Sequence, residues 1–300
     1  MRILISGSSG FIGSALVSSL KTVHQDIFKL VRKQDNLAID EISWSPDTGV
    51  IHTDLLEGFD AVINLAGENI MGRWSESKKQ KIYDSRINST TLLSDALTRL
   101  NQPPKVLVNA SAIGIYGNIG DELVDETSPI SNQPAFLVEV CKDWEVATQN
   151  AKAAGVRVVN LRIGAVLSTH GGALQKMLTP FKWGVGGVIG SGEQYMSWIM
   201  LEDLVKAIKF CITHETLRGP VNAVSPNPVT NREFTKTLGK ILNRPTFITV
   251  PAFAVNLLLD GMGTEVLLTG QRVEPRALLE AGFRFSHPFI DEGLKTALQK

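Results

Sequence analysis

The sequence predicts an α/β fold in which a doubly wound parallel sheet carries a smaller C-terminal lobe. Two observations predict it. Short apolar segments alternate with segments of helical periodicity as far as residue 167, and the pattern then gives way to a glycine-rich stretch. Parallel strands are joined by helical crossovers, and sheets of this kind have helices on both faces. The 300 residues suffice for one large domain or two modest ones.

The strands and helices follow from the spacing of apolar residues. Apolar and β-branched runs predict strands at 2–6, 26–31, 61–65, 105–110, 157–163 and 220–224. Apolar residues at helical spacing predict helices at 11–20, 75–100, 139–154, 202–213, 230–242 and 252–259. We expect Glu202 and Asp203 to cap the helix at 202–213, and a Thr/Asn pair to open the helix at 230–242.

The composition is that of a globular chain without a dominant charge. Hydrophobic residues make up 43% and charged residues 20%, and thirty basic residues balance thirty acidic ones. Zero formal charge argues against a broad electrostatic grip on nucleic acid or an anionic membrane. Since no apolar run approaches the ~18 residues of a membrane span, we expect a cytoplasmic protein. Its expected partner is a small-molecule substrate, and we expect it to bind neither nucleic acid nor a membrane. Formation of a homo-oligomer is left as an open possibility.

The cysteines and histidines show no metal-binding pattern. Cys141 and Cys211 are far apart in the sequence, and the five histidines are scattered without a His-x-x-x-His pair. We expect two reduced thiols in the core and no metal site.

The strongest chemical signal is the opening segment ILISGSSGFIG. It places Gly7, Gly10 and Gly13 in a G-x-x-G-x-x-G pattern between the first strand and the first helix. Gly7 permits a tight turn, Gly10 lets the backbone approach a diphosphate, and Gly13 lets the helix pack closely on the sheet. The free N–H groups at the start of the helix would then face the phosphates. This context predicts a Rossmann-type dinucleotide-binding domain.

The end of the second strand predicts which dinucleotide is bound. An acidic residue there would bind the ribose 2′-hydroxyl of NAD. The sequence instead has Arg32 and Lys33, and a guanidinium can hold a 2′-phosphate. We therefore predict NADP as the cofactor, while nearby Asp35 leaves use of NAD open.

These signals divide the chain into two parts. Residues 1–167 form the predicted dinucleotide-binding domain, and its sheet is completed by about 199–225. The segments 168–198 and 226–300 form the predicted substrate lobe. The first of these segments contains seven glycines and little periodicity, so we expect a long functional loop there.

Several motifs together resemble the short-chain dehydrogenase/reductase superfamily. GSSGFIG, NLAG, VNASAIGIYG and LRIGAVLS are similar to segments of its extended, epimerase-like members. Two further segments, GGALQKMLTPFKWGVGGVIGSGEQYMSWI and LLTGQRVEPRALLEAGFRFSHP, resemble one branch of epimerase-family proteins that has its own short C-terminal domain. The resemblance runs over nearly the whole chain.

The resemblance implies a set of cofactor contacts. Besides Gly13 and Lys33, which follow from the motifs above, it places the cofactor at Gly7, Ser9, Gly10, Phe11, Ile12, Arg32, Ala66, Gly67 and Glu68. It also counts Arg86, on the long helix, among the cofactor-binding residues as a second pocket residue. An arginine on the inner side of that helix needs an anion or a buried acceptor; the alternative is an arginine extending along the helix surface.

The resemblance also implies a catalytic Ser, Tyr and Lys, and only the serine is present. Ser111 matches the serine that polarises the substrate carbonyl. Phe136 and Val140 stand where the Tyr-x-x-x-Lys pair is expected, and neither can exchange a proton. Tyr116 is the remaining tyrosine candidate, and the alternative that the resemblance implies is a structural role for this tyrosine of the IYG segment. Glu139 and Lys142 are alternatives at the start of the next helix, unless they are solvated surface charges.

The expected function is therefore that of an NADP-binding, epimerase-like oxidoreductase acting on a small polar or nucleotide-linked substrate. The absent Tyr/Lys pair keeps a second hypothesis open, an NADP-binding regulatory or sensor protein with little catalysis.

Overall fold

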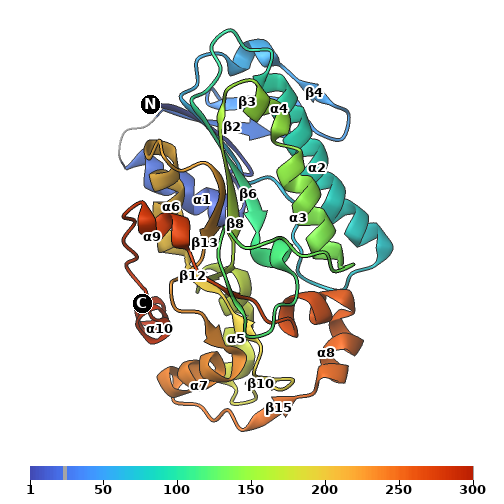
Figure 1. Ribbon diagram of the computed structural model, residues 1–300, viewed down its shortest axis with the longest axis vertical. Helices are drawn as coiled ribbons and strands as arrows, with labels where there is room; N and C mark the ends of the chain where they lie inside the picture. The colour runs from blue at the N-terminus through green and yellow to red at the C-terminus, as the bar shows by residue number, and fades with distance from the viewer. Residues whose placement is uncertain (23–25, 300) are drawn as a thin grey trace.

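A computed structural model describes residues 1–22 and 26–299. Within these residues, eight strands form one sheet in the order β13-β8-β6-β5-β1-β2-β3-β4 (Figure 1). Neighbouring strands are parallel, except that β4 runs antiparallel to β3. The strands are β1 (Arg2–Ser6), β2 (Asp26–Val31), β3 (Glu41–Ser45), β4 (Val50–Ile51), β5 (Ala61–Asn64), β6 (Val106–Ala112), β8 (Arg157–Ile163) and β13 (Gly219–Ala223). This confirms the predicted Rossmann-type α/β class.

Helices cover both faces of the sheet, because each strand presents alternate side chains to the two sides. Ile3 and Ile5 of β1 pack toward α1 and α6, whereas Leu4 packs toward α2 and α4. The helices are α1 (Phe11–Lys21) and α6 (Leu201–Thr213) on one face, and α2 (Glu76–Leu97), α3 (Phe136–Val146) and α4 (Gln149–Ala153) on the other. The strand β5 is buried along its whole length and is apolar except for Asn64, as expected for a sheet covered on both faces.

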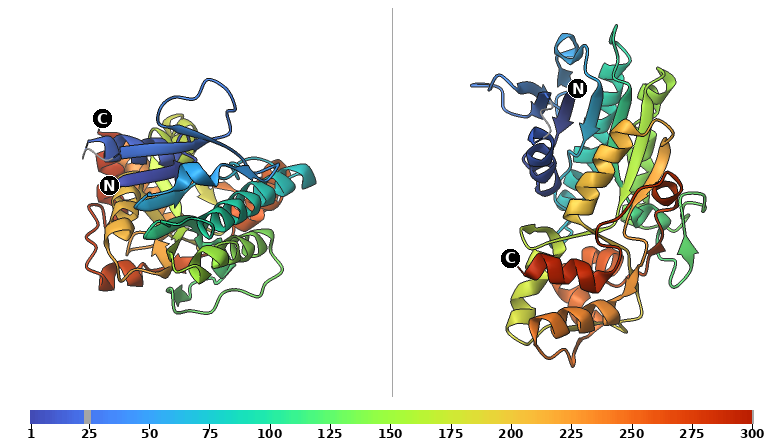
Figure 2. Two further views of the ribbon diagram at one scale, coloured as in Figure 1. Left: turned by 90° about the horizontal axis from the view of Figure 1, so that it is seen from above. Right: turned by 90° about the vertical axis from the view of Figure 1, so that its left-hand side faces the viewer.

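The C-terminal lobe lies below the sheet in Figure 1 and is seen from the side in Figure 2. Its core contains Leu174, Phe181, Trp198, Phe234 and Leu294. Its helices are α5 (Gly172–Lys182), α7 (Asn231–Leu242), α8 (Ala252–Leu259), the π-helix Gly263–Leu267 and α10 (Ile290–Leu298). Paired short strands support them: β9 (Ala165–Ser168) with β12 (Trp198–Met200), β10 (Gly187–Ile189) with β15 (Ile248–Val250), and β11 (Tyr195–Met196) with β14 (Val229–Thr230).

The remaining short elements border the sheet. They are β7 (Leu123–Val124), which pairs with β16 (Arg272–Val273), the 3-10 turns Thr53–Leu56 and Ile113–Tyr116, and α9 (Arg276–Glu280).

Two sequence-based predictions of elements are wrong. The helix predicted at 139–154 is two helices, α3 and α4, which are separated at Thr148, whose hydroxyl donates to the Glu145 carbonyl. The stretch 168–198 is not a loop. It contains α5, whose Leu174, Leu178 and Phe181 lie four and three residues apart and enter the lobe's core. The many glycines of this segment are typical of a loop, and for that reason the helical spacing of its apolar residues was overlooked.

The predicted opening of α7 is confirmed. Thr230 is the N-cap residue, and it forms a reciprocal capping box with Glu233.

The predicted cap of α6 is wrong in one respect, because Met200 is the N-cap residue and no side chain caps the helix. Glu202 and Asp203 do lie in its first turn, at the positive end of the helix dipole, as predicted. Asp203 is fully buried and reaches outside the helix, where its carboxylate accepts hydrogen bonds from the backbone N–H groups of Ser286 (2.8 Å) and His287 (2.9 Å). It therefore ties the segment that precedes α10 to the sheet domain.

Replacing Asp203 with asparagine is expected to lower the free energy of unfolding by about 2–3 kcal/mol, since one buried N–H would face an amide donor. Denaturant unfolding measures this loss. Asp291→Asn, in an exposed ion pair with Lys295 in α10, is the matched control and should cost at most about 0.5 kcal/mol. Equal losses in the two variants would show that Asp203 does not hold the segment before α10 to the sheet domain.

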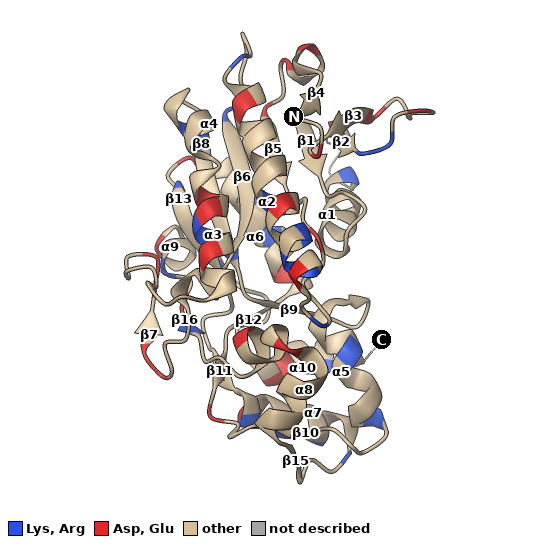
Figure 3. Cartoon of the chain, turned by 90° about the vertical axis from the view of Figure 1, so that its right-hand side faces the viewer, with Lys and Arg blue, Asp and Glu red and all other residues tan. Residues whose placement is uncertain are grey.

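In the described residues, no helix combines the length and the apolarity needed to cross a membrane. Acidic and basic positions are interspersed along α2 and α3 (Figure 3), in keeping with zero formal charge.

Candidate functional site

The glycine turn lies at the carboxyl end of β1, where the strand order reverses between β2 and β5. Gly7 has φ +68°, and a Cβ there would stand 2.5 Å from the Leu65 carbonyl oxygen. A Cβ at Gly13 would collide with the Gly7 carbonyl. Both positions therefore require glycine for the turn to close and for α1 to approach the sheet. Ligands of open α/β sheets bind at such a switch point.

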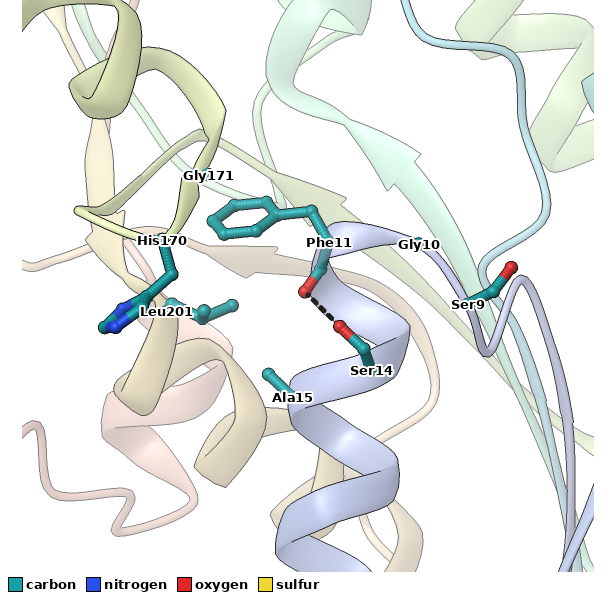
Figure 4. Close-up of a pocket in the computed structure, with 8 residues that line it drawn as sticks. All are labelled: Ser9, Gly10, Phe11, Ser14, Ala15, His170, Gly171 and Leu201. Carbon is teal, nitrogen blue, oxygen red and sulfur yellow. Dashed lines mark hydrogen bonds between the residues drawn. The ribbon is translucent and has the colours of Figure 1, made fainter.

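The amino terminus of α1 has no side chain to satisfy its first amides. Its N-cap residue is Gly10, and no side-chain cap is formed. The Phe11 ring turns away from the turn and lies against Gly171 and Gly172 of the C-terminal lobe (Figure 4). Free N–H groups and the positive end of the helix dipole therefore face the space beside the turn. This arrangement suits a phosphate.

Two hollows meet at this turn. The first, of about 420 Å³, runs between α1 and the lobe and is lined by Ser9, Phe11, Ser14, His170 and Leu201 (Figure 4). The second is a cleft of about 590 Å³, within the size range of cofactor sites. It extends from the turn to both sides of β1, and its walls include Gly7, Ser9, Gly10, Arg32, Lys33, Trp44, Ala66, Gly67, Glu68 and Ser85.

Three cations follow one another along the β2 side of this cleft, and they differ in their partners. Lys29 pairs with Asp40 at 2.7 Å, and Lys33 pairs with Glu41 at 3.4 Å. Within the described part of the chain, no carboxylate pairs with the exposed guanidinium of Arg32. Arg32 is thus the cation at this end of the cleft that retains its full capacity for an anion.

The β5 side of the cleft is formed by Leu65–Glu68. The Glu68 backbone N–H donates to Ser85 Oγ (2.9 Å), and its carboxylate accepts from Lys78 Nζ at 2.5 Å. That hydrogen bond lowers the pKa of Glu68, so the carboxylate is ionised at neutral pH.

Arg86 projects from α2 to the edge of this side. Arg86 is half-buried, and its guanidinium donates to the Ile82 carbonyl (3.0 Å) and lies 5.0 Å from the centre of the Trp144 ring. A Cβ at Gly67 would lie 3.3 Å from its central carbon. Burial lowers the pKa of Arg86.

Ser111 and Tyr116 belong to one buried polar network. Ser111 Oγ donates to Glu145 Oε1 (2.8 Å), and the same carboxylate holds Arg162 through two hydrogen bonds (2.8 and 2.9 Å). Arg162 Nη1 donates to Tyr116 Oη (2.9 Å), which also contacts Asn222 Oδ1 and the Asp125 carbonyl. The network joins α3 to the ends of β6, β8 and β13.

This network engages both hydroxyl groups that the sequence suggested for catalysis. Tyr116 is 1% exposed, and burial raises its pKa, which opposes proton exchange near neutral pH. Ser111 is 2% exposed. The contacts of Tyr116 favour a structural role, and Ser111 would have to release Glu145 before donating to a substrate.

The start of α3 holds no proton donor of the expected type. Phe136 packs edge-on against Trp74 (5.3 Å), Val140 is buried, and Glu139 is exposed. A carboxylate of the C-terminal lobe occupies the helix terminus instead: Glu265 accepts from the backbone N–H groups of Phe136 (3.2 Å) and Leu137 (2.8 Å). No motif indicated this contact, which joins residues almost 130 positions apart in the chain.

A family comparison decides which group of proteins this site belongs to. The model of the NAD dependent epimerase/dehydratase family matches residues 3–223. The chain belongs to this family. A second model, a domain of unknown function (DUF1731), matches residues 250–297, in the C-terminal lobe. The predicted membership of an epimerase-like branch with its own C-terminal domain is thereby confirmed.

Relatives of similar length support this membership. An epimerase family protein of Mycobacterium leprae is 45% identical over 98% of this chain and 95% of its own length. A chloroplastic epimerase family protein of Arabidopsis thaliana is 37% identical over 100% of this chain and 87% of its own. The human epimerase family protein SDR39U1, crystallised with NADPH, is 33% identical with a TM-score of 0.91, and each chain is covered completely.

Sequence reasoning missed the polar row beneath the cleft. Ser6, Asn64, Asn109 and Asn160 occupy one register row across β1, β5, β6 and β8, and all four are buried. Asn64 joins the row by accepting from Ser6 and donating to Asn109 (2.7 Å). Single polar residues near the ends of apolar strands were the available signal, but their alignment depends on the strand register.

Proposed function

We propose that this protein binds NADP(H) in the cleft beside the glycine turn and acts as an epimerase-like oxidoreductase on a small polar or nucleotide-linked substrate. One observation carries the proposal: the uncapped amino terminus of α1 borders the same cleft as the guanidinium of Arg32, which pairs with no carboxylate of residues 1–22 and 26–299. They suit the diphosphate and the 2′-phosphate of one NADP molecule. The human relative crystallised with NADPH supports this choice of dinucleotide.

The residues of the cleft also suit the remainder of the cofactor. Gly7, Ser9, Gly10 and the backbone of Phe11, Ile12 and Gly13 would surround the diphosphate, while Ala66, Gly67 and Glu68 would line the nicotinamide half. Lys33 would act as a secondary cation, because it already pairs with Glu41. When bound, the nicotinamide supplies or accepts a hydride.

Replacing Arg32 with alanine is expected to weaken NADPH binding by about tenfold to a hundredfold, since a charge-assisted contact contributes about 1.5–3 kcal/mol. NADH affinity should stay nearly unchanged. Calorimetric titration of both dinucleotides measures the difference. Lys33→Ala is the matched control and should reduce NADPH affinity less. An equal loss of NADH and NADPH affinity in Arg32→Ala would show that Arg32 does not bind the 2′-phosphate.

A second candidate function is that of an NADP-binding sensor with little catalysis. It is favoured by Phe136 and Val140 at the start of α3 and by the engaged hydroxyl of Tyr116. Purified protein should be assayed with NADPH and a panel of carbonyl compounds and sugar nucleotides. Hydride transfer that Ser111→Ala abolishes, with NADPH binding intact, would support the enzyme and exclude the sensor. Binding without turnover would support the sensor.

A further inference from the structure

Five large apolar side chains of the C-terminal lobe project into solvent. They are 71–85% exposed, and they are Trp183, Phe247, Phe253, Leu257 and Leu258. Among the described residues, Ile39 is the only other large apolar side chain that is as exposed as these. Single exposed apolar residues are normal on a protein, whereas a group of this size on one lobe marks an interaction site. We call this group the apolar surface of the lobe.

The two chain segments that carry the apolar surface are adjacent. The strand β10 pairs in parallel with β15. Just before these strands, Arg244 Nε donates to the Lys182 carbonyl oxygen (2.8 Å). The helix α8 begins directly after β15. The apolar surface therefore lies on the part of the lobe that β10, β15 and α8 form (Figure 1).

The helix α8 presents most of its apolar side chains to water. Its sequence AFAVNLLL contains no charged residue (Figure 3), and among its eight residues only Val255 is buried. Phe253 and Leu257 are four positions apart, so they share one face of the helix, and Leu258 adjoins them. A helix this apolar is expected to be covered by another apolar surface.

The apolar surface does not belong to the cofactor site. None of its five side chains lines either of the two hollows beside the glycine turn. A small ligand buries most of its own area in a concave site. Side chains that project as far as these form a convex surface instead, which suits a large and flat partner.

Cations surround the apolar surface, although the whole chain is neutral. The segments 172–200 and 226–260 contain six Lys or Arg against three Asp or Glu. Of these carboxylates, Glu193 pairs with Arg232 (3.0 Å), and Glu233 completes the capping box of α7. Four exposed lysines form no ion pair with any carboxylate of residues 1–22 and 26–299, and they are Lys176, Lys182, Lys236 and Lys240.

We infer that the apolar surface of the lobe docks on an anionic membrane surface, with its aromatic and leucine side chains at the headgroup boundary. Binding of this kind combines buried apolar area with the attraction of Lys and Arg to anionic lipids, and no segment crosses the bilayer. A second copy fits this surface less well, because a two-fold contact would bring the unpaired lysines together. The prediction that the protein binds no membrane used the charge of the whole chain, which averages over this local excess.

Sedimentation with vesicles tests the inference on the full chain. At low salt, the wild type should bind vesicles of phosphatidylcholine and phosphatidylglycerol at least about tenfold more tightly than vesicles of phosphatidylcholine alone. About 0.5 M NaCl should remove most of that difference. The variant Phe253→Ser/Leu257→Ser/Leu258→Ser should bind the mixed vesicles at least about tenfold more weakly.

A second variant tests the charges. Lys182→Glu/Lys240→Glu should also lose at least about tenfold in affinity for the mixed vesicles. Two control variants carry the same changes at exposed positions of the sheet domain and should bind as the wild type does: Val50→Ser/Leu55→Ser/Val146→Ser for the apolar residues and Lys105→Glu/Lys152→Glu for the cations. All four variants should keep the NADPH affinity of the wild type, which shows that they are folded.

Either of two results would overturn the inference: no binding of the wild type to the mixed vesicles, or unchanged vesicle binding by the α8 variant. A wild-type dimer that the α8 variant cannot form, observed by analytical ultracentrifugation and without vesicle binding, would assign the surface to a second copy and also overturn it. Failure of the wild type to bind NADPH would contradict the proposed function alone, because the membrane inference does not depend on the cofactor.

Discussion

Gly7→Ala is expected to abolish NADPH binding and to lower the free energy of unfolding by about 3–4 kcal/mol. A left-handed φ of +68° strains any L-residue, and the new Cβ would stand 2.5 Å from the Leu65 carbonyl oxygen. Relief of that clash must separate β1 from β5 at the switch point. The turn would then no longer present the amides of α1 to a diphosphate. Denaturant unfolding and NADPH calorimetry measure the two effects.

Gly155→Ala is the matched control for this substitution. Gly155 has φ +87°, but beyond its two chain neighbours no atom of the described residues lies within 4 Å of its Cβ position, and it does not line the cleft. It should cost about 1–2 kcal/mol from backbone strain alone and leave NADPH affinity unchanged. If Gly7→Ala bound NADPH as well as Gly155→Ala does, the close approach at the turn would have no part in cofactor binding.

Glu145→Gln is expected to lower the free energy of unfolding by about 3–5 kcal/mol, because it leaves the buried guanidinium of Arg162 without a full counter-charge. The side chains of Arg162 and Glu145 are 5% and 14% exposed. The same substitution disturbs the partner of Ser111 and, through Arg162, that of Tyr116. Urea unfolding measures the loss.

Two comparisons make the Glu145 result specific. Glu280→Gln breaks the exposed pair with Arg276 and should cost at most about 1 kcal/mol. The double variant Glu145→Leu/Arg162→Met should recover much of the loss, since removing both charges leaves no uncompensated ion. If the double variant were as unstable as Glu145→Gln, the loss of stability would not come from the broken ion pair.

The parts of the site that sequence reasoning could predict are local in the chain. The glycine turn depends on residues 7–13 and on the strand and helix that flank them, so its pattern is legible without a structure. Arg32 directly follows the second strand, and its place in the cleft follows from the fold class. The absence of the expected tyrosine was likewise evident from the sequence, because Phe136 occupies its position in the spacing that follows Ser111.

The remaining features depend on register and distant contacts. Glu145 and Arg162 meet only because α3 packs over the end of β8, and Glu265 reaches α3 from the C-terminal lobe. The helix α5 was missed because the glycines around it dominate the composition of the segment. Helix and strand propensities carry no information on which buried charges will pair across the fold.

The central claim is that the amides at the start of α1 hold the diphosphate of NADP while Arg32 binds its 2′-phosphate. A crystal structure of the protein soaked with NADPH tests it most directly. The account predicts diphosphate oxygens within hydrogen-bond distance of the backbone N–H groups beside Gly10, and the 2′-phosphate on the Arg32 guanidinium. A dinucleotide bound away from the glycine turn, or with its 2′-phosphate distant from Arg32, would contradict it.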